Sequence, residues 1–325
     1  GASPTVPDGK TLTNNGTVTV EEGGTLTNKG SLDCNHHTGG TATCTEKAKC
    51  DLCGAENGDF LTPVRHFPSN ANADEKTLLS HIRTVIETAV SDSPVPVTRA
   101  GLAFPGPFDY QNGIPLMQNI NKYDALYQKD LLAFFKQSFP GITFRFANDA
   151  DLFGLGEYHF CGEPREERIM YICIGTGLGS CFIENGALIK QRADVPPLGW
   201  IFAEPFDHDI IDRMVSGSAL LNMIRHDSAL CHLQDVRTAA EAAFSGNQAA
   251  IRLFECFGDR LVRAVTPFLE RFHAQRLVVG GQISKSFSLF GTKLQNECAI
   301  RKIALSLCPS SADYAMKGTL QLFDS

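Results

Sequence analysis

An asparagine and an aspartate follow a predicted strand, at a place where a carboxylate could act as a general base. The strand is Thr143–Ala147, and Asn148-Asp149-Ala150-Asp151 comes directly after it. In open α/β sheets ligands bind beyond the carboxyl ends of strands, so Asp149 could take a proton from a hydroxyl that attacks a phosphoryl group. The alternative is that Asn148 and Asp149 only cap a helix expected to begin near Leu152.

A glycine-rich loop follows another predicted strand, Arg168–Ile174. The loop reads Gly175-Thr176-Gly177-Leu178-Gly179-Ser180, and its glycines allow backbone N–H groups to approach phosphate oxygens. The chain then continues as a hairpin that turns on Asn185-Gly186. Because a strand follows the loop, a Rossmann or Walker motif is excluded. A glycine turn without any ligand is the alternative.

A third glycine motif lies near the end of the chain. The short predicted strand Arg276–Val279 leads into Gly280-Gly281-Gln282-Ile283-Ser284, which permits close approach by the adenosine of a nucleotide. The helical pattern before it, Gln248–His273, is expected to be interrupted at Pro267.

Cysteines and a histidine near the start of the chain have the spacing of a small metal site. Cys50-Asp51-Leu52-Cys53-Gly54, with Cys44 or Cys34 and with His37, would supply four ligands to Zn²⁺. Disulfide pairing and reduced cysteines without a ligand are the alternatives. The other seven cysteines lack metal spacing and are expected to be buried free thiols: Cys161, Cys173, Cys181, Cys231, Cys256, Cys298 and Cys308.

The composition of the chain changes near residue 63. Residues 1–63 contain twelve Thr and ten Gly, and Phe60 is their only aromatic residue. Such a segment cannot bury much apolar surface, whereas residues 64–325 read as an ordinary globular domain. We therefore expect a β-rich, Cys-containing segment over 1–63 and a separate domain over 64–325.

The first segment contains an internal repeat. Gly9–Thr17 recurs fourteen residues later as Gly23–Ser31, and its Thr, Val and Asn-Gly composition is typical of hairpins or β-solenoids. The stretch resembles the repeats of bacterial cell-surface proteins, and two copies are too few for a stable solenoid.

The second part alternates helical and strand patterns. Apolar residues recur at three- and four-residue steps from residue 74 and predict a helix that ends at Pro94 and Pro96. A strand at Arg99–Phe104 and a helix around Lys129–Phe139 precede the motifs described above. These elements predict an α/β domain.

The overall composition excludes several classes of protein. The chain has 325 residues and a formal net charge of -7, which argues against a generic nucleic-acid binder. No apolar run reaches the roughly 20 residues needed to span a bilayer. The opening GASPTVPDGK has neither a basic start nor an apolar run, so no signal peptide is expected there. We expect a cytoplasmic protein.

Five motifs follow one another in a recognisable order over about residues 64–325. They are Pro105-Gly106-Pro107-Phe108-Asp109, Asn148-Asp149-Ala150-Asp151, Ile174–Gly179 with Asn185-Gly186, Ser216-Gly217-Ser218-Ala219 and Gly280-Gly281-Gln282-Ile283-Ser284. In this order they resemble the ROK family of bacterial sugar kinases and sugar-responsive repressors. The resemblance implies a two-lobed actin-like (ribonuclease H-like) fold, with lobes at 64–147 and 148–325, and a homodimer. It also implies ATP- and Mg²⁺-dependent phosphorylation of a hexose or aminohexose hydroxyl.

The same resemblance implies roles for single residues. Asp149 matches the general base of the family, and Asn148 and Asn119 match sugar contacts. Asp212 stands where a sugar-binding Glu is common. The nucleotide-binding candidates are Gly175, Thr176, Gly177 and Gly179 of the second phosphate loop, and Gly280 and Gly281 of the adenosine strand.

The chain also departs from the family pattern. The usual Glu-x-Gly-His is replaced by Pro197-Leu198-Gly199-Trp200, and the usual Cys-rich zinc loop by Ala203–His208. Trp200 could stack on a sugar face or belong to the core. The first phosphate loop of the family, Asp-x-Gly-Gly-Thr, is imitated only by Glu21-Glu22-Gly23-Gly24-Thr25, which the repeat explains equally well.

These departures leave more than one function open. The first hypothesis is a sugar kinase, and the alternative is a non-catalytic sugar-binding or regulatory protein that lacks a competent phosphate loop. Residues 1–63 alone would suggest a surface module. A repressor is disfavoured because no helix-turn-helix pattern precedes the kinase-like part.

Overall fold

A computed structural model describes residues 60–118, 122–161 and 168–323 of the chain. By their internal contacts the residues divide into two units, Gly1–Leu61 and Thr62–Ser325, and the second holds nearly all described residues. The repeat, the zinc candidates and the imitation of the first phosphate loop lie outside the described residues. The predicted boundary near residue 63 therefore stays a prediction.

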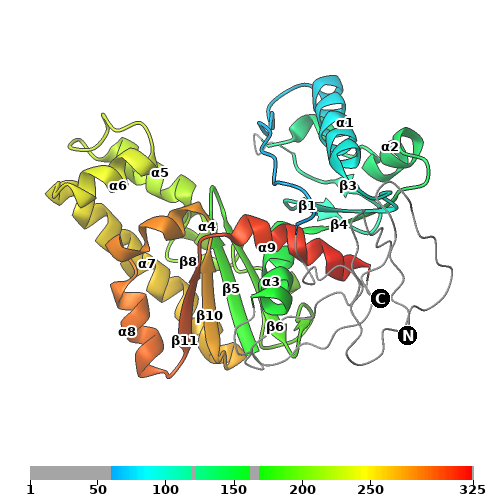
Figure 1. The fold of residues 1–325 in the computed structure, drawn as a ribbon. Coiled ribbons are helices and arrows are strands. Elements are labelled where there is room, and N and C mark those ends of the chain that lie inside the picture. The colour runs from blue at the N-terminus through cyan, green and yellow to red at the C-terminus, as the bar shows by residue number, and fades with distance from the viewer. Residues whose placement is uncertain (1–59, 119–121, 162–167, 324–325) are drawn as a thin grey trace, which may run out of the picture. The chain divides into compact units, whose positions relative to one another are not determined.

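A five-stranded mixed sheet forms the centre of the second unit (Figure 1). β5 lies between two partners, antiparallel to β6 and parallel to β10, while β7 and β11 are the edge strands. The glycine loop thus connects two neighbouring antiparallel strands, and the turn at Asn185-Gly186 leads into β7, both as predicted. The strands are β5 (Arg168–Ile174), β6 (Leu178–Glu184), β7 (Ala187–Leu188), β10 (Arg276–Gly280) and β11 (Ala304–Cys308).

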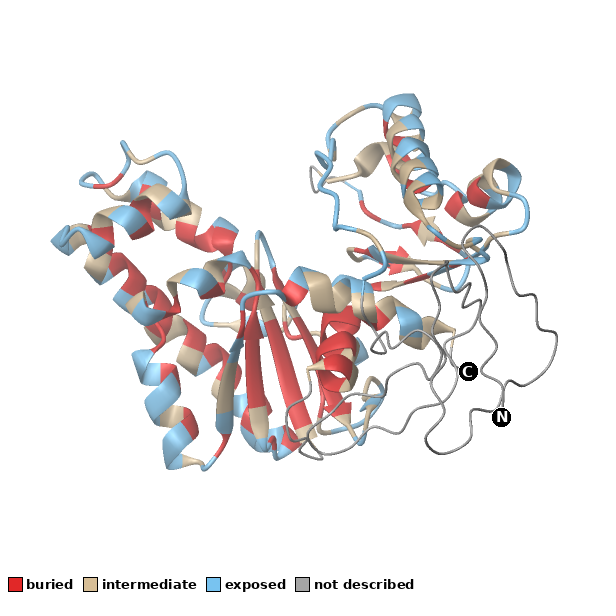
Figure 2. Ribbon diagram, viewed as in Figure 1, coloured by how far each residue is buried: buried red, intermediate tan, exposed pale blue. Residues whose placement is uncertain are grey.

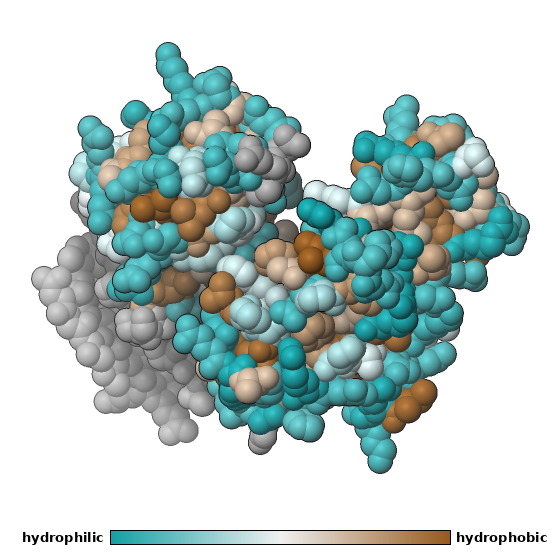
Figure 3. All heavy atoms as spheres, turned by 180° about the vertical axis from the view of Figure 1, so that it is seen from behind, coloured by the Kyte–Doolittle hydropathy of each residue, from teal (hydrophilic) through white to brown (hydrophobic). Residues whose placement is uncertain are grey.

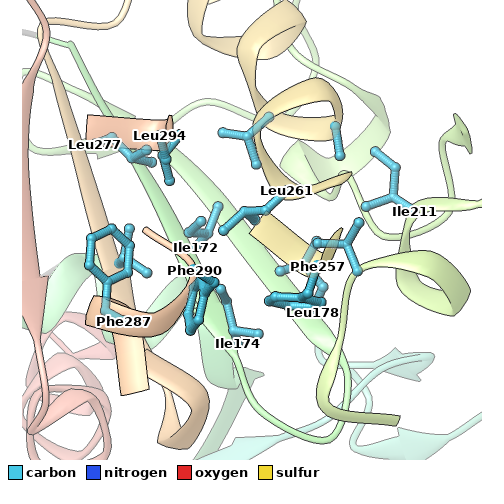
Figure 4. Close-up of a cluster of buried hydrophobic side chains, with 14 of the residues drawn as sticks. Ile172, Ile174, Leu178, Ile211, Phe257, Leu261, Leu277, Phe287, Phe290 and Leu294 are labelled. Carbon is cyan, nitrogen blue, oxygen red and sulfur yellow. The ribbon is translucent and has the colours of Figure 1, made fainter. Parts of the chain in front are cut away.

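Helices cover both faces of this sheet, so its central strands are buried almost throughout (Figure 2). Alternate side chains of β5 point to opposite faces, as the two-residue period of a strand requires. Met170, Ile172 and Ile174 join the core with α7 (Gln248–Phe272), which Figure 4 shows in part. Ile169 and Tyr171 pack with residues of α3 (Asp149–Phe160) on the other face.

A second, two-stranded sheet precedes the large one in the chain. β1 (Arg99–Phe104) and β4 (Thr143–Asn148) pair in parallel, with Phe104 opposite Asn148. Its core contains side chains of α1 (Glu75–Asp92) and α2 (Leu131–Ser138) and is rich in phenylalanine. The predicted helices and strands of this region are confirmed.

Helices α3 and α9 (Ser311–Gly318) approach each other at two glycines. A Cβ atom on Gly156 of α3 would lie 1.7 Å from the carbonyl oxygen of Tyr314, and one on Gly318 of α9 would lie 2.0 Å from that of Leu152. The absence of a side chain at both positions therefore allows the two backbones to touch.

The remaining elements are short or lie around α7. The helices are α4 (Ile211–Met214), α5 (Gly217–His226), α6 (Val236–Phe244) and α8 (Thr292–Ile300), with 3₁₀ turns at Asp124–Leu126, Pro197–Gly199, Gln282–Leu289 and Thr319–Leu322. The small strands are β2 (Phe108–Asp109), β3 (Ile114–Pro115), β8 (Pro205–Phe206) and β9 (Asp209–Ile210).

Two predictions about helices need correction. Helix α7 runs without a break through Pro267, since the turns around it are anchored by buried Ala264, Val265 and Phe268. Helix α3 begins at Asp149 rather than near Leu152, because Asn148 caps it.

Two of the seven cysteines expected to be buried are exposed. They are Cys231 and Cys256, while Cys161 and Cys173 are half-buried. An exposed cysteine on a helix or turn breaks no apolar pattern, so the periodicity did not separate these two from the rest.

Thiol labelling should follow this division. Burial raises the pKa of Cys298 to about 11 and that of Cys308 to about 12, so these thiols stay protonated and inaccessible at neutral pH. With iodoacetamide and peptide mapping of the native protein, Cys231 and Cys256 should be labelled first. Comparable early labelling of Cys298 or Cys308 would contradict the packing described here.

No helix among the described residues is long and apolar enough to cross a bilayer. On the face shown in Figure 3, hydrophilic side chains predominate and apolar ones form small separate groups.

Candidate functional site

A pocket of about 690 Å³ gathers residues that follow three different strands. Asn148 and Asp149 follow β4, the glycine loop follows β5, and Gly281 follows β10. Its volume is within the range of small-molecule sites. The structure therefore brings together residues that lie more than 130 positions apart in the sequence.

Asn148 is held by hydrogen bonds at both ends of its side chain. Its Oδ1 accepts from the backbone N–H groups of Ala150 at 3.0 Å and Asp151 at 3.3 Å, and its Nδ2 donates to the Tyr110 hydroxyl at 3.2 Å. Tyr110 in turn donates to the carbonyl of Phe104 at 3.0 Å. Asn148 is thus a helix cap, and through Tyr110 it is also tied to β1, the strand that pairs with β4.

Asp149 is the first residue of α3 and is exposed on the pocket wall. Asn148 caps the helix, and the Asp149 carboxylate makes no hydrogen bond or ion pair with a side chain of the described residues. It accepts only from the backbone N–H of the neighbouring Ala150, at 3.0 Å. The positive end of the helix dipole favours a negative charge at this place. A carboxylate so placed can accept a proton from a bound hydroxyl.

An ion pair with a buried carboxylate lies two residues further along α3. The Asp151 side chain is 1% exposed, and its Oδ2 lies 2.5 Å from Lys190 Nζ. Burial raises the pKa of Asp151, while Lys190 and then the indole N–H of Trp200 oppose that rise. The indole N–H makes no hydrogen bond of ordinary geometry within the described residues. Asp151 therefore orients Lys190 and stays behind the pocket wall rather than on it.

The glycine loop is held from one side by the segment 212–218. Gly217 N donates to the Gly175 carbonyl at 2.8 Å, and Ser218 N donates to that of Thr176 at 3.0 Å. The Asp212 carboxylate accepts from Leu178 N at 2.7 Å, and burial raises its pKa.

The loop keeps two donors for a ligand. In the described part of the chain no hydrogen bond uses the N–H groups of Thr176 and Gly177, and both residues are exposed on the pocket. Successive free backbone N–H groups of this kind form an anion-binding concavity.

The two glycines at the end of β10 differ in their surroundings. Gly281 lines the pocket with φ of 90°, and its Cβ would lie 2.4 Å from the Ile174 carbonyl oxygen. Gly280 is buried, and its Cβ would lie 2.7 Å from the Phe153 ring. Gly281 thus faces the pocket, whereas Gly280 allows close packing behind it.

A turn of unusual backbone places Trp200 on the pocket wall. Leu198 and Gly199 have φ of 58° and 75°, and Ser180 braces the turn by donating to the Gly199 carbonyl and accepting from Ile201 N, both at 2.9 Å. The indole ring of Trp200 lies close to Gly106, since a Cβ atom added to that glycine would be 3.6 Å from the ring.

Two pocket residues had no signal in the sequence. Lys122 is the one basic side chain that lines the pocket in the described ranges, and it precedes no recognisable motif. Ser311 of α9 accepts from Gly281 N at 3.0 Å, and only the docking of α9 beside β10 places it there.

Several predicted site residues lie outside the described residues. Asn119 is one of them. The zinc candidates Cys34, His37, Cys44, Cys50 and Cys53 are the others. Within the described ranges, no three or more His, Cys, Asp and Glu side chains are grouped as metal ligands.

Comparisons with known proteins agree on one family. A family model described as "ROK family" matches residues 45–308. The chain is 24% identical to a glucokinase of Thermotoga maritima, over 73% of this chain and 80% of that protein. It is 22% identical to an N-acetylmannosamine kinase of Citrobacter koseri, over 87% of this chain and 96% of that protein.

Solved structures show the same fold. A ROK family glucokinase from Streptomyces griseus, in complex with glucose and AMPPNP, superposes with a TM-score of 0.62 at 18% identity. The match covers 77% of this chain and 88% of that one. The predicted actin-like α/β fold is confirmed.

Proposed function

Because the chain belongs to the ROK family, we propose that it is an ATP-dependent kinase of a hexose or aminohexose, with Asp149 as general base. The observation that supports this most directly is the shared pocket, in which the exposed carboxylate of Asp149 and the free N–H groups of Thr176 and Gly177 face the same space. A proton acceptor and a phosphate cradle are the two parts that phosphoryl transfer to a hydroxyl requires.

The reaction divides between these residues. Asp149 accepts the proton of the sugar hydroxyl as its oxygen bonds to the γ-phosphorus, and the bond from that phosphorus to the bridging oxygen breaks to release ADP. Thr176 and Gly177 donate to phosphate oxygens. Lys122, on the same pocket, supplies positive charge toward the transferred group.

Mg²⁺ fits this pocket as an ion that arrives with the nucleotide. Magnesium is usually bound by one or two carboxylates, substrate phosphates and waters rather than by an all-protein cage. The exposed Asp149 carboxylate is the described residue that would reach it. When bound, the ion neutralises charge on the phosphates.

The proposal is tested by ADP release with a panel of hexoses, aminohexoses and N-acetylated aminohexoses, each with and without ATP and Mg²⁺. We expect ADP release that depends on one sugar class, together with a product heavier by one phosphoryl group in mass spectrometry. The absence of both turnover and sugar binding, the latter measured by calorimetry, would contradict the proposal. A homodimer and a cytoplasmic location are part of the same proposal.

A second candidate is a sugar-binding protein without turnover. It is favoured by the wall at Pro197-Leu198-Gly199-Trp200, which carries neither a carboxylate nor an imidazole. Tight sugar binding in calorimetry without ADP release would support this candidate over the kinase.

Trp200 should contribute to binding of the sugar rather than of ATP. We propose that its indole stacks on the C–H face of the sugar ring, an aromatic contact worth about 1 kcal/mol. Trp200→Ala should then raise the sugar KM by about fivefold, whereas Trp200→Phe should keep most of the affinity and the ATP KM should stay within twofold in both. An unchanged sugar KM in Trp200→Ala would place the indole outside the sugar site.

A further inference from the structure

We propose that Asp212 is a positioning residue for the glycine loop and acts on nucleotide binding, not on the sugar. The proposal rests on the proposed use of ATP. It differs from the role implied by the family resemblance, in which this position contacts the sugar. The contact that leads to it is the hydrogen bond from Leu178 N to Asp212 Oδ1 at 2.7 Å.

Residues 212–218 hold the loop at Gly175, at Thr176 and at Leu178, where β6 begins. Asp212 binds the N–H of Leu178, and the first turn of α5 binds the carbonyls of Gly175 and Thr176. Gly175 N also donates to the Gly177 carbonyl at 2.9 Å. Together these bonds leave the N–H groups of Thr176 and Gly177 as the free donors toward the pocket.

The fit between Asp212 and the loop is close. A Cβ on Gly177 would lie 3.0 Å from Asp212 Oδ1, and one on Gly217 would lie 2.4 Å from the Gly175 carbonyl oxygen. Glycine at both positions lets the segment and the loop approach to hydrogen-bonding distance. The loop therefore has little freedom to move toward Asp212.

The hydrophobic core anchors both partners of this contact. Ile174 and Leu178, which flank the loop, and Ile211, which precedes Asp212, are buried in the same cluster (Figure 4). The backbone N–H of Asp212 donates to the Phe202 carbonyl at 3.0 Å. Because these positions are held by packing, the carboxylate can set the direction of the loop instead of following it.

Two substitutions separate the hydrogen bond from the charge. Asp212→Ala removes the acceptor of Leu178 N, and Asp212→Asn keeps an acceptor oxygen while removing the charge. The loss of a hydrogen bond to a charged group costs a free energy that corresponds to a change in binding of about tenfold or more. We expect Asp212→Ala to raise the ATP KM about tenfold with a sugar KM within twofold, and Asp212→Asn to stay within about threefold for both.

A second measurement does not depend on turnover. In hydrogen exchange followed by NMR, the Leu178 amide should exchange at least about tenfold faster in Asp212→Ala than in the wild type, and AMPPNP binding in calorimetry should weaken in parallel. Asp209→Ala is the matched control, because this carboxylate bonds Ile210 N and Arg213 and does not line the pocket. It should change neither quantity.

Three results would overturn the inference. They are a tenfold rise in sugar KM with an unchanged ATP KM, equal losses in the Ala and Asn variants, and an unchanged exchange rate of Leu178 in Asp212→Ala. A wild-type protein that neither binds AMPPNP nor turns over would instead contradict the proposed kinase function. The exchange of Leu178 still tests the loop contact in that case.

Discussion

Asp149→Asn is expected to lower kcat by about 10²–10⁴-fold, the range that a positioned general base contributes. The asparagine side chain has nearly the same shape but cannot accept the proton of the sugar hydroxyl. The sugar KM should change little, because Asn148 rather than Asp149 caps α3 and the pocket keeps its form. Initial rates of ADP release at saturating sugar measure this effect.

The control for that substitution is Asp130→Asn. Asp130 caps α2 by accepting from Ala133 N at 2.7 Å, and asparagine caps a helix equally well. This variant should keep wild-type rates, and both variants should unfold at the wild-type temperature. If Asp149→Asn retains activity within threefold of wild type, Asp149 is not the base.

Gly156→Ala is expected to lower the free energy of unfolding by at least about 3 kcal/mol. The new Cβ would lie 1.7 Å from the Tyr314 carbonyl oxygen, and backbone atoms of α9 can only yield if the two helices separate. For a domain of this size the melting temperature should fall by roughly 6–12 °C. Thermal and urea unfolding followed by circular dichroism measure the change.

Asn296→Ala is the control for the helix contact. Asn296 is exposed on α8, where such substitutions usually change stability by less than about 0.5 kcal/mol. A melting temperature of Gly156→Ala equal to that of this control would show that α3 and α9 do not touch at Gly156. Because Asp149 begins α3, the loss of this contact should also lower kinase activity.

Local patterns were sufficient to predict most of the elements that build the site. β1, β4, β5 and β10 lie within a residue or two of the predicted strands, and the turn at Asn185-Gly186 is where the two-residue signal placed it. These features depend on alternation, turn residues and helix caps, which act over a few residues. For the same reason the glycine loop could be recognised as one that joins two strands.

Features that depend on packing could not be predicted. The continuation of α7 through Pro267 and the exposure of Cys231 and Cys256 follow from what surrounds each residue. The partner of Asp212 is a backbone N–H 34 residues earlier, and no spacing rule connects the two. The sequence showed that Trp200 departs from the family pattern. Its place on the pocket wall depends on the two hydrogen bonds by which Ser180 holds the turn at Gly199 and Ile201.

The sequence by itself determined which residues could do chemistry: a carboxylate after a strand, a glycine loop and a second pair of glycines, in an order that resembles one family. It did so because each motif is a local constraint on backbone shape. Only the tertiary structure decided that these motifs share one pocket, that Lys122 and Ser311 belong to it, and that Asp212 holds the loop. The physical reason is that the parallel strands β5 and β10 end at one edge of their sheet, whereas β4 lies in another sheet. Long-range packing, which includes the close contact of α3 and α9 at two glycines, therefore selects which side chains meet there.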